Sequence, residues 1–391
     1  MSYRKKANYL RKVLPGGTLR ALSAPVRGPV HLLMAVADHF EPAVSPEGGA
    51  KRVPRPEQER RLEFWVREYP KAVDRWRDHD GRPFLHTYFY PAEQYDEGLV
   101  EMLADHCHSG WGETEIHLHH GYPEPDTENN TRQMLAEFRD RLAFRHRCLA
   151  MEEGENQPRY CFVHGNFALA NSRDGINCGV DSEMKVLAET GCYADFTLPT
   201  GTWHSAQTAK INSLYECALP LDEAVPHRRG IDLVAGRRPR IFPLILQGPL
   251  VADLRRSGHS LSPTLETGAI TQPNPMNLHR LALWKQAKIR VAGRPDWLFI
   301  KLHCHSMDPL QQDVVIGNSF RKFLEELVSG AGERKETLHF VTAREMANIA
   351  LAACDGKDGD PGDYRDYRFK RFKDVPAAAE KTDSVPAAVK G

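Results

Sequence analysis

Histidines follow directly after short apolar runs at four places in this 391-residue chain. The polar residues that end these runs are Asp38, His39, His117, His119, His120, His164, His303 and His305. Short apolar runs are typical of buried strands, and the C-terminal ends of parallel strands meet on one face of the fold. Imidazole and carboxylate groups gathered on that face suit zinc or a similar divalent ion. The pattern therefore predicts a metal-dependent hydrolase.

Two of the runs end in a His-x-His pair. Because side chains alternate along a strand, His117 and His119 point to one side, and so do His303 and His305. Two such pairs at separate strand ends are harder to attribute to an exposed strand edge than one. One pair could bind a metal while the other transfers protons, since imidazole titrates near neutral pH. The alternative is an exposed polar edge without a ligand for the first pair, and a histidine satisfied within the core for the second.

Two other strand ends carry polar groups in less specific patterns. Asp38 and His39 end the first apolar run, and Glu41 follows them. A turn at the strand end could present both, with Asp38 as a metal ligand or a general base, although an Asp there could also simply cap a loop. His164 could bind substrate or metal, and Asn166 after it could donate a hydrogen bond.

The rest of the chain alternates between apolar runs and amphipathic segments. Strands are predicted at 31–37, 83–90, 114–118, 160–163, 193–198, 241–246, 297–302 and 338–342. Helices are predicted at 57–79, 127–150, 181–190, 276–291 and 310–329, and from 343 onward. Seven or eight repeats of strand and helix favour a parallel sheet closed into a barrel, with a doubly wound open sheet as the alternative. Nucleotide binding has little support, because no glycine-rich phosphate loop is present.

Composition divides the chain into three parts. Residues 1–29 form a basic arm with seven Lys or Arg and no Asp or Glu. We expect it to be an uncleaved, solvated lead-in, with weak contact to a membrane surface as the alternative. Residues 30–354 are predicted to be a single catalytic barrel domain with an irregular insertion at 199–240. Residues 355–391 have little to bury and are expected to be disordered.

Overall composition narrows the class of protein. Hydrophobic residues make up 41% of the chain and charged residues 27%, as in ordinary globular proteins. The formal net charge is zero, so nothing argues for a nucleic-acid partner. No apolar run approaches the roughly 18 residues that span a bilayer. The eight cysteines are scattered without a Cys-x-x-Cys pair, which favours reduced thiols and a cytoplasmic location.

The order of these motifs resembles that of the polysaccharide deacetylase superfamily, the carbohydrate esterase family 4 type. Residues 36–42 (VADHFEP) resemble the family's first-strand Thr-Phe-Asp-Asp-Gly-Pro motif, and 115–120 (EIHLHH) resemble the lead into its His-x-x-x-His motif. Residues 302–303 resemble its late Leu-His motif, and 338–345 its last strand and helix. The resemblance covers about 30–346 and implies a distorted (β/α) barrel of about seven strands.

The resemblance also implies roles for residues of the first and late motifs. Asp38 corresponds to the family's catalytic base, and His39 stands where its metal-binding second Asp would be. His303 corresponds to the histidine that assists as an acid. The segment from His164 to Asn166 departs from the family's Arg-Pro-Tyr motif.

The second motif matches only in part. His119 corresponds to the first metal-binding His of the family motif. Its partner four residues on would be Pro123, which cannot bind a metal, so His117 or His120 could substitute.

The resemblance and the motifs together predict removal of an acyl group, N-acetyl or similar, from a sugar or polysaccharide precursor. The predicted metal ligands are His39, His117 and His119, with Zn²⁺ as the expected ion. The predicted substrate-binding residues are Glu41, His164, Asn166 and His305. The alternatives are another metal-dependent amidohydrolase or phosphoesterase and a carbohydrate-binding barrel without catalysis.

Overall fold

A ten-stranded, mostly parallel sheet forms the centre of the computed structural model of this chain. The described residues are 22–26, 28–47, 51–199, 210–217, 220–224, 230–254 and 264–374. The strands of the sheet are β1 (Val30–His39), β2 (His86–Pro91), β3 (Gly112–Leu118), β5 (Tyr160–His164), β6 (Cys192–Asp195), β7 (Leu214–Glu216), β8 (Ile231–Asp232), β9 (Leu244–Leu246), β12 (Trp297–Cys304) and β13 (Glu336–Phe340). Two small antiparallel sheets pair β10 (Val251–Asp253) with β11 (Thr264–Glu266) and β4 (Ala150–Glu152) with β14 (Phe369–Arg371).

The order of the strands shows that the sheet is open. It runs β12-β1-β2-β3-β5-β6-β9-β7-β8, with β13 joined to β1. The pairs from β12 to β9 are parallel, whereas β7 is antiparallel to both β8 and β9. Among the described residues no ladder joins β8 or β9 to β12. The predicted (β/α) barrel of about seven strands is therefore wrong, and the fold is an open α/β sheet.

Pairing at two strand edges explains why the sheet does not close. The edge of β9 that a closing strand would need is taken by β7. The outer edge of β12 is met by a loop, where Ile270 N donates to His303 O at 2.8 Å and His303 N donates to Gly268 O at 3.0 Å. Strands β7 and β8 are three and two residues long, too short to show a periodic pattern in the sequence.

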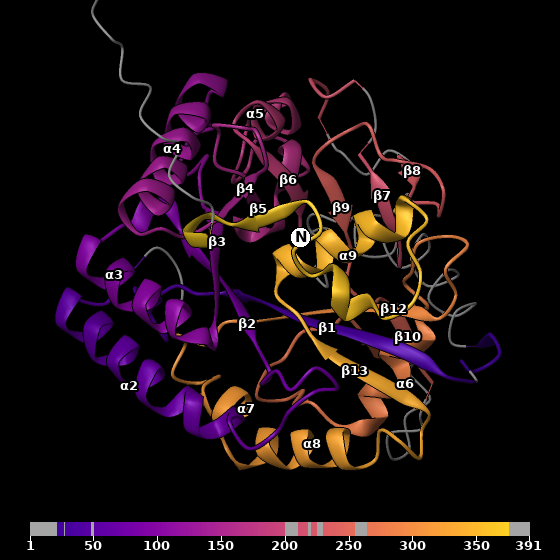
Figure 1. Cartoon of the computed structure of the whole chain (residues 1–391). Helices are drawn as coiled ribbons and strands as arrows, with labels where there is room; N and C mark the ends of the chain where they lie inside the picture. Colours follow the sequence, from indigo (N-terminus) through magenta and orange to yellow (C-terminus); the bar gives the residue numbers. More distant parts are fainter. Residues whose placement is uncertain are drawn as a thin grey trace, which may run out of the picture.

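Helices lie on both faces of the sheet. They are α2 (Arg55–Val73), α3 (Glu97–His106), α4 (Glu128–Asp140), α5 (Glu183–Glu189), α6 (Leu278–Gln286), α7 (Asp313–Ile316), α8 (Asn318–Ser329) and α9 (Ala343–Cys354). Figure 1 shows α2, α3, α7 and α8 around one side, α4 and α5 beside β5 and β6, and α9 across the middle. Helix α9 begins with a capping box between Thr342 and Glu345, and it packs against β1 and β5.

Alternate residues of β1 pack into two different cores. The core shared with α2, α3 and α8 takes Leu32, Met34 and Val36. The core shared with α9 takes Leu33, Ala35 and Ala37. Because side chains alternate along a strand, the end of β1 directs Asp38 toward the first core and His39 toward the other side of the sheet.

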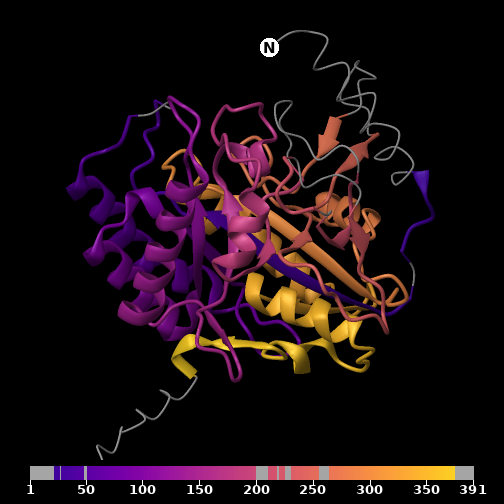
Figure 2. The ribbon, with the colours of Figure 1, turned by 90° about the horizontal axis from the view of Figure 1, so that it is seen from above.

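Packed structure continues beyond Cys354, where the sequence predicts that a disordered tail begins. Strand β14 pairs antiparallel with β4, and Arg365 is buried among acidic side chains. Figure 2 shows this segment lying alongside α9. The composition of this segment is typical of a solvated tail, but its charged residues form ion pairs. Packed structure therefore continues to Asp374. The rest of the predicted tail, 375–391, lies outside the described residues.

Other predicted segments are described only in part. Residues 1–21 of the basic arm lie outside the described residues. The described portions of the 199–240 insertion contain β7 and β8. In the described part of the chain, no helix combines the length and apolar character needed to cross a membrane.

Candidate functional site

Several imidazoles surround one carboxylate at the C-terminal ends of β1, β3 and β12, and we name this group the histidine cluster. Its members are His39, Glu41, His117, His119, His303 and His305. Strands β12, β1, β2 and β3 are neighbours, so their ends bring segments from distant parts of the chain together. All three predicted metal ligands lie in this cluster, and so does the predicted acid His303.

Three imidazoles converge on a single oxygen of Glu41. The distances to Glu41 Oε1 are 3.3 Å from His117 Nε2, 3.8 Å from His119 Nε2 and 4.0 Å from His305 Nε2. The centre of the His39 ring lies 4.9 Å from that of His117 and 4.6 Å from that of His305. One ligand atom from each of His39, Glu41 and His117 lies within 4.8 Å of the others. A single metal ion can bind atoms at this spacing.

Hydrogen bonds at Nδ1 orient the rings of His117 and His119, so that Nε2 of each ring points toward Glu41. His117 Nδ1 donates to Val163 O at 2.6 Å, so its Nε2 is left with a lone pair. That Nε2 is buried and makes no aligned hydrogen bond in the structure. His119 Nδ1 lies 2.9 Å from Glu93 Oε1. Carbonyl and carboxylate partners of this kind orient metal-binding histidines in proteins.

The electrostatics of the cluster also suit a cation. Burial alone would raise the pKa of Glu41, but the adjacent His117 and the charges of His119 and His305 lower it to about 2. Burial, followed by the neighbouring His305 and His117, holds the pKa of His39 well below its usual range. At neutral pH the cluster therefore combines an ionised carboxylate with a neutral imidazole. These are the protonation states in which both groups bind metals.

A cleft of about 560 Å³ borders the cluster at Glu41 and His119. Polar side chains that line it belong to Lys51, Arg52, Gln94, Asn166 and Asn177. Tyr122 also lines the cleft and is 70% exposed. The cleft can therefore offer hydrogen bonds and one aromatic face to a ligand.

Asp38, the predicted catalytic base, does not face this cluster. Its carboxylate is fully buried, with Oδ2 accepting from His86 Nδ1 at 2.9 Å and Oδ1 from Ser306 N at 3.0 Å. Burial alone would raise the pKa of Asp38, but the bonds from His86 and Ser306 lower it. Strand alternation thus separates Asp38 from His39 and ties it to the turn after β12.

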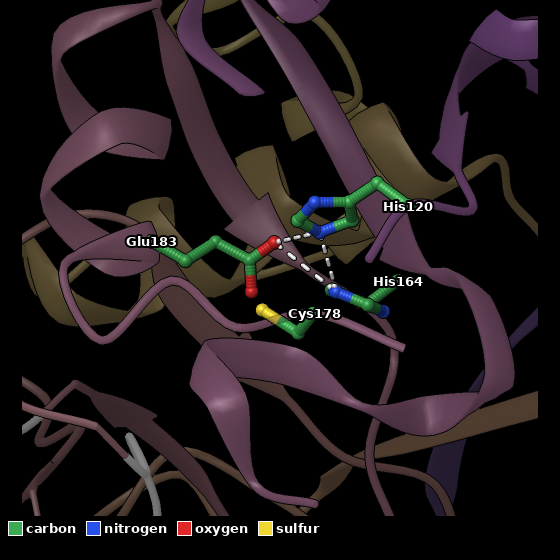
Figure 3. A group of neighbouring side chains, drawn as sticks. All are labelled: His120, His164, Cys178 and Glu183. Carbon is green, nitrogen blue, oxygen red and sulfur yellow. Dashed lines mark hydrogen bonds and ion pairs between the residues drawn. The ribbon is translucent and has the colours of Figure 1, made fainter. Parts of the chain in front are cut away.

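The two predicted substrate-binding residues of the β5 end lie in different places. Asn166 lines the cleft, whereas His164 is buried in a second group that we name the His120 cluster. Figure 3 shows its members, which are His120, His164, Cys178 and Glu183. Burial would lower the histidine pKa values, but acidic neighbours raise the pKa of His120 to about 12 and that of His164 to about 9.

Two residues near the histidine cluster were missed by the sequence analysis. Lys301 is buried in β12, and its Nζ donates to Phe196 O at 2.6 Å. Burial lowers the pKa of Lys301 to about 7 despite the nearby charge of Asp195. A lysine inside the apolar run of β12 was a signal that could have been used. Glu93 follows β2 in a short turn, where nothing in the local pattern marks it.

The described residues contain several groups of His, Cys, Asp and Glu side chains that could hold a metal ion. Comparison with known proteins finds no match to any protein-family model and none to a curated protein sequence. The donor groups and their geometry are therefore the basis for inferring a function.

Proposed function

We propose that this chain is a metal-dependent hydrolase whose histidine cluster holds a zinc ion. The observation that carries the proposal is the convergence of His117, His119 and His305 on one oxygen of Glu41 beside a cleft. Buried carboxylates surrounded by imidazoles are costly to maintain unless they bind or exchange a cation.

The donor set fits a catalytic ion better than a purely structural one. His39, Glu41 and His117 supply three ligand atoms, and catalytic zinc sites use three protein ligands and leave one position open. The buried Nε2 of His117 makes no aligned hydrogen bond and lies 3.3 Å from Glu41 Oε1, so both atoms are placed to bind the same ion. When bound, the ion would polarise a carbonyl group and lower the pKa of water.

Other residues of the cluster would orient groups and move protons. The Glu93 carboxylate holds His119 at two points. Its Oε1 lies 2.9 Å from His119 Nδ1, and its Oε2 accepts from the backbone amide of His119 at 3.2 Å. The side chain of His305 is 40% exposed, whereas His303 is only 8% exposed. We therefore assign proton exchange with the leaving group to His305, with His303 buried beside His39.

The proposed substrate is an acylated sugar, with an N-acetyl or similar amide as the bond that is cleaved. Two observations support this choice. The cleft is lined by hydrogen-bonding side chains with the exposed ring of Tyr122, a combination that suits a hydroxylated ring. The motif order in the sequence also resembles that of polysaccharide deacetylases. Lys51 and Arg52 would additionally favour an anionic precursor, such as a sugar carrying a phosphate.

The test combines elemental analysis with a hydrolysis panel. We expect His117→Ala to lose one equivalent of zinc relative to the native chain and to lose hydrolysis of acyl-sugar substrates. His146→Ala is the matched control, since His146 is buried but binds Glu101 outside the cluster. It should retain both metal and activity.

The panel should include acyl-sugar, simple amide and phosphoester substrates. Release of phosphate alone would replace the deacylase proposal with a phosphoesterase acting through the same residues. A native chain that binds sugar but neither contains nor takes up zinc would overturn the hydrolase proposal and favour a binding protein.

A further inference from the structure

The His120 cluster gathers four potential metal ligands from four separate segments. His120 follows β3, His164 ends β5, Cys178 lies in the loop after β5, and Glu183 is the first residue of α5. Figure 3 shows their side chains pointing toward one another. Cys178, His164 and Glu183 are fully buried, and His120 is 8% exposed. The proposed hydrolase mechanism uses none of the four.

The nitrogen and oxygen atoms of the His120 cluster lie within hydrogen-bond distance of one another. His120 Nε2 lies 2.9 Å from His164 Nε2 and 2.9 Å from Glu183 Oε1. His164 Nε2 lies 3.1 Å from the same oxygen of Glu183. All four ligand atoms, including Cys178 Sγ, lie within 4.8 Å of one another.

Hydrogen bonds at Nδ1 orient the rings of His120 and His164, so that Nε2 of each ring points into the His120 cluster. His164 Nδ1 donates to Gly165 O at 2.6 Å, and His120 Nδ1 donates to Asp126 Oδ2 at 2.8 Å. Both Nδ1 atoms therefore carry hydrogen, and in the neutral rings both Nε2 atoms present lone pairs. Two lone pairs, a carboxylate oxygen and a sulfur then face one another in a buried space. Such an arrangement requires a positive charge, which protons on the two imidazoles supply when no metal is bound, as their raised pKa values indicate, and which a metal ion would supply in their place.

We propose that the His120 cluster is a closed structural zinc site. Four protein ligands that leave no open position are the hallmark of structural zinc, whereas the histidine cluster keeps an open one. The thiolate of Cys178 selects against Mg²⁺ and Ca²⁺, which prefer oxygen ligands. The charges of Cys178 and Glu183 would balance those of the ion, so that no net charge is buried.

The site would fasten a loop that has little regular structure of its own. Between β5 and α5 the non-glycine residues with positive φ are Asn166, Phe167, Ala170, Asn171, Asp174 and Asn177. The left-handed conformation is strained for residues such as Phe167 and Ala170, and less so for Asn and Asp. Ligands at both ends of this loop would offset the cost. The same loop supplies Asn166 and Asn177 to the cleft.

Cobalt provides a probe that separates the two clusters. Co²⁺ bound to a thiolate absorbs strongly in the near ultraviolet, whereas Co²⁺ bound by only histidine and carboxylate groups does not. The histidine cluster contains no cysteine, so a thiolate band reports on other sites. The experiment uses the full chain produced in zinc-depleted medium with Co²⁺ added. We expect the native chain to show the band and Cys178→Ala to lose it together with one equivalent of cobalt.

The matched control is Cys304→Ala. Cys304 is buried beside Asp38 and His86 in another group that could hold a metal, and its removal should leave the band unchanged. A native chain without the band, or a band that survives in Cys178→Ala, would overturn the proposal. Cys178→Ser keeps nearly the same side-chain size, and it should also lose the band, so the test stands if Cys178→Ala fails to fold. If the structural zinc site is disproved, the hydrolase proposal still has its own test, because His117→Ala changes the histidine cluster and not the His120 cluster.

Discussion

At the scale of single residues, the second nitrogen of each imidazole determines what the ring can bind. His117 gives its Nδ1 proton to the carbonyl of Val163, and His119 pairs its Nδ1 with Glu93. Both rings then present Nε2 to Glu41. The sequence indicated the imidazoles but not these partners, because Val163 acts through its backbone and Glu93 lies 26 positions before His119.

Glu93→Gln tests the role of the carboxylate that holds His119. The variant keeps the size of the side chain and removes its charge. We expect kcat/KM to fall about 10- to 100-fold, because the His119 ring loses the carboxylate that orients it beside Glu41. Steady-state kinetics on the acyl-sugar substrate measures the loss. Glu101→Gln is the control, because Glu101 holds His146 at 2.7 Å outside the cluster. Equal losses in the two variants would contradict a specific role for Glu93.

At the scale of elements, strand alternation predicted which side chains share a face but not where each strand ends. The rings of His117 and His119 lie 4.5 Å apart, as a His-x-His pair on one face requires. His119 and His120 are adjacent in sequence but enter different clusters, because β3 ends at Leu118 and the chain then turns. A strand end is set by the pairing of its neighbours, which the local sequence does not contain.

Gly165→Ala tests how tightly the turn after β5 supports the cluster. An added Cβ would lie 2.3 Å from the His119 ring and 2.8 Å from Leu118 O, so the ring or the turn must move. We expect about a 100-fold loss of kcat/KM, the scale reported for small displacements of catalytic groups. Gly332→Ala is the control, since a Cβ there meets nothing within 4 Å. Unchanged kinetics in Gly165→Ala would show that His119 does not need its present position.

At the scale of the whole molecule, the parallel sheet was predictable and its failure to close was not. The alternation of strands and helices agrees with the parallel pairing of β1, β2, β3, β5 and β6. Closure depends instead on β7 and on the loop at 268–270, which occupy the edges of β9 and β12. Their short, irregular segments carry no hydrophobic period from which pairing could be inferred.

Acid sensitivity is expected from the charges that anchor the C-terminal segment. Burial alone would raise the pKa of Glu345, but Arg82, Arg365 and Arg344 lower it. Its stabilising contribution is therefore complete above the unfolded-state pKa of about 4.5 and is lost as the pH falls through the lower folded-state value. Urea unfolding of the native chain should show the free energy of unfolding declining below about pH 4.5.

Glu345→Gln should lower the free energy of unfolding by about 3 kcal/mol at pH 7, because it removes one of the carboxylates that pair with buried Arg365. Its stability should then depend less on pH than that of the native chain. Glu333→Gln, at an exposed position, is the control and should behave like the native chain. A pH dependence that is the same in Glu345→Gln and the native chain would assign the acid sensitivity to other groups.

The ion pairs of Arg365 also constrain how the chain acquires its fold during synthesis. Arg365 contacts Asp78 and Asp80, which precede it by 287 and 285 positions. Those two carboxylates leave the ribosome long before their partner, and β1 likewise waits for β12 and β13. The contacts of the first quarter of the chain are therefore completed only after the segment that contains Arg365 has been synthesised. A message cut short just before Arg365 would yield a target for proteases rather than a smaller working protein.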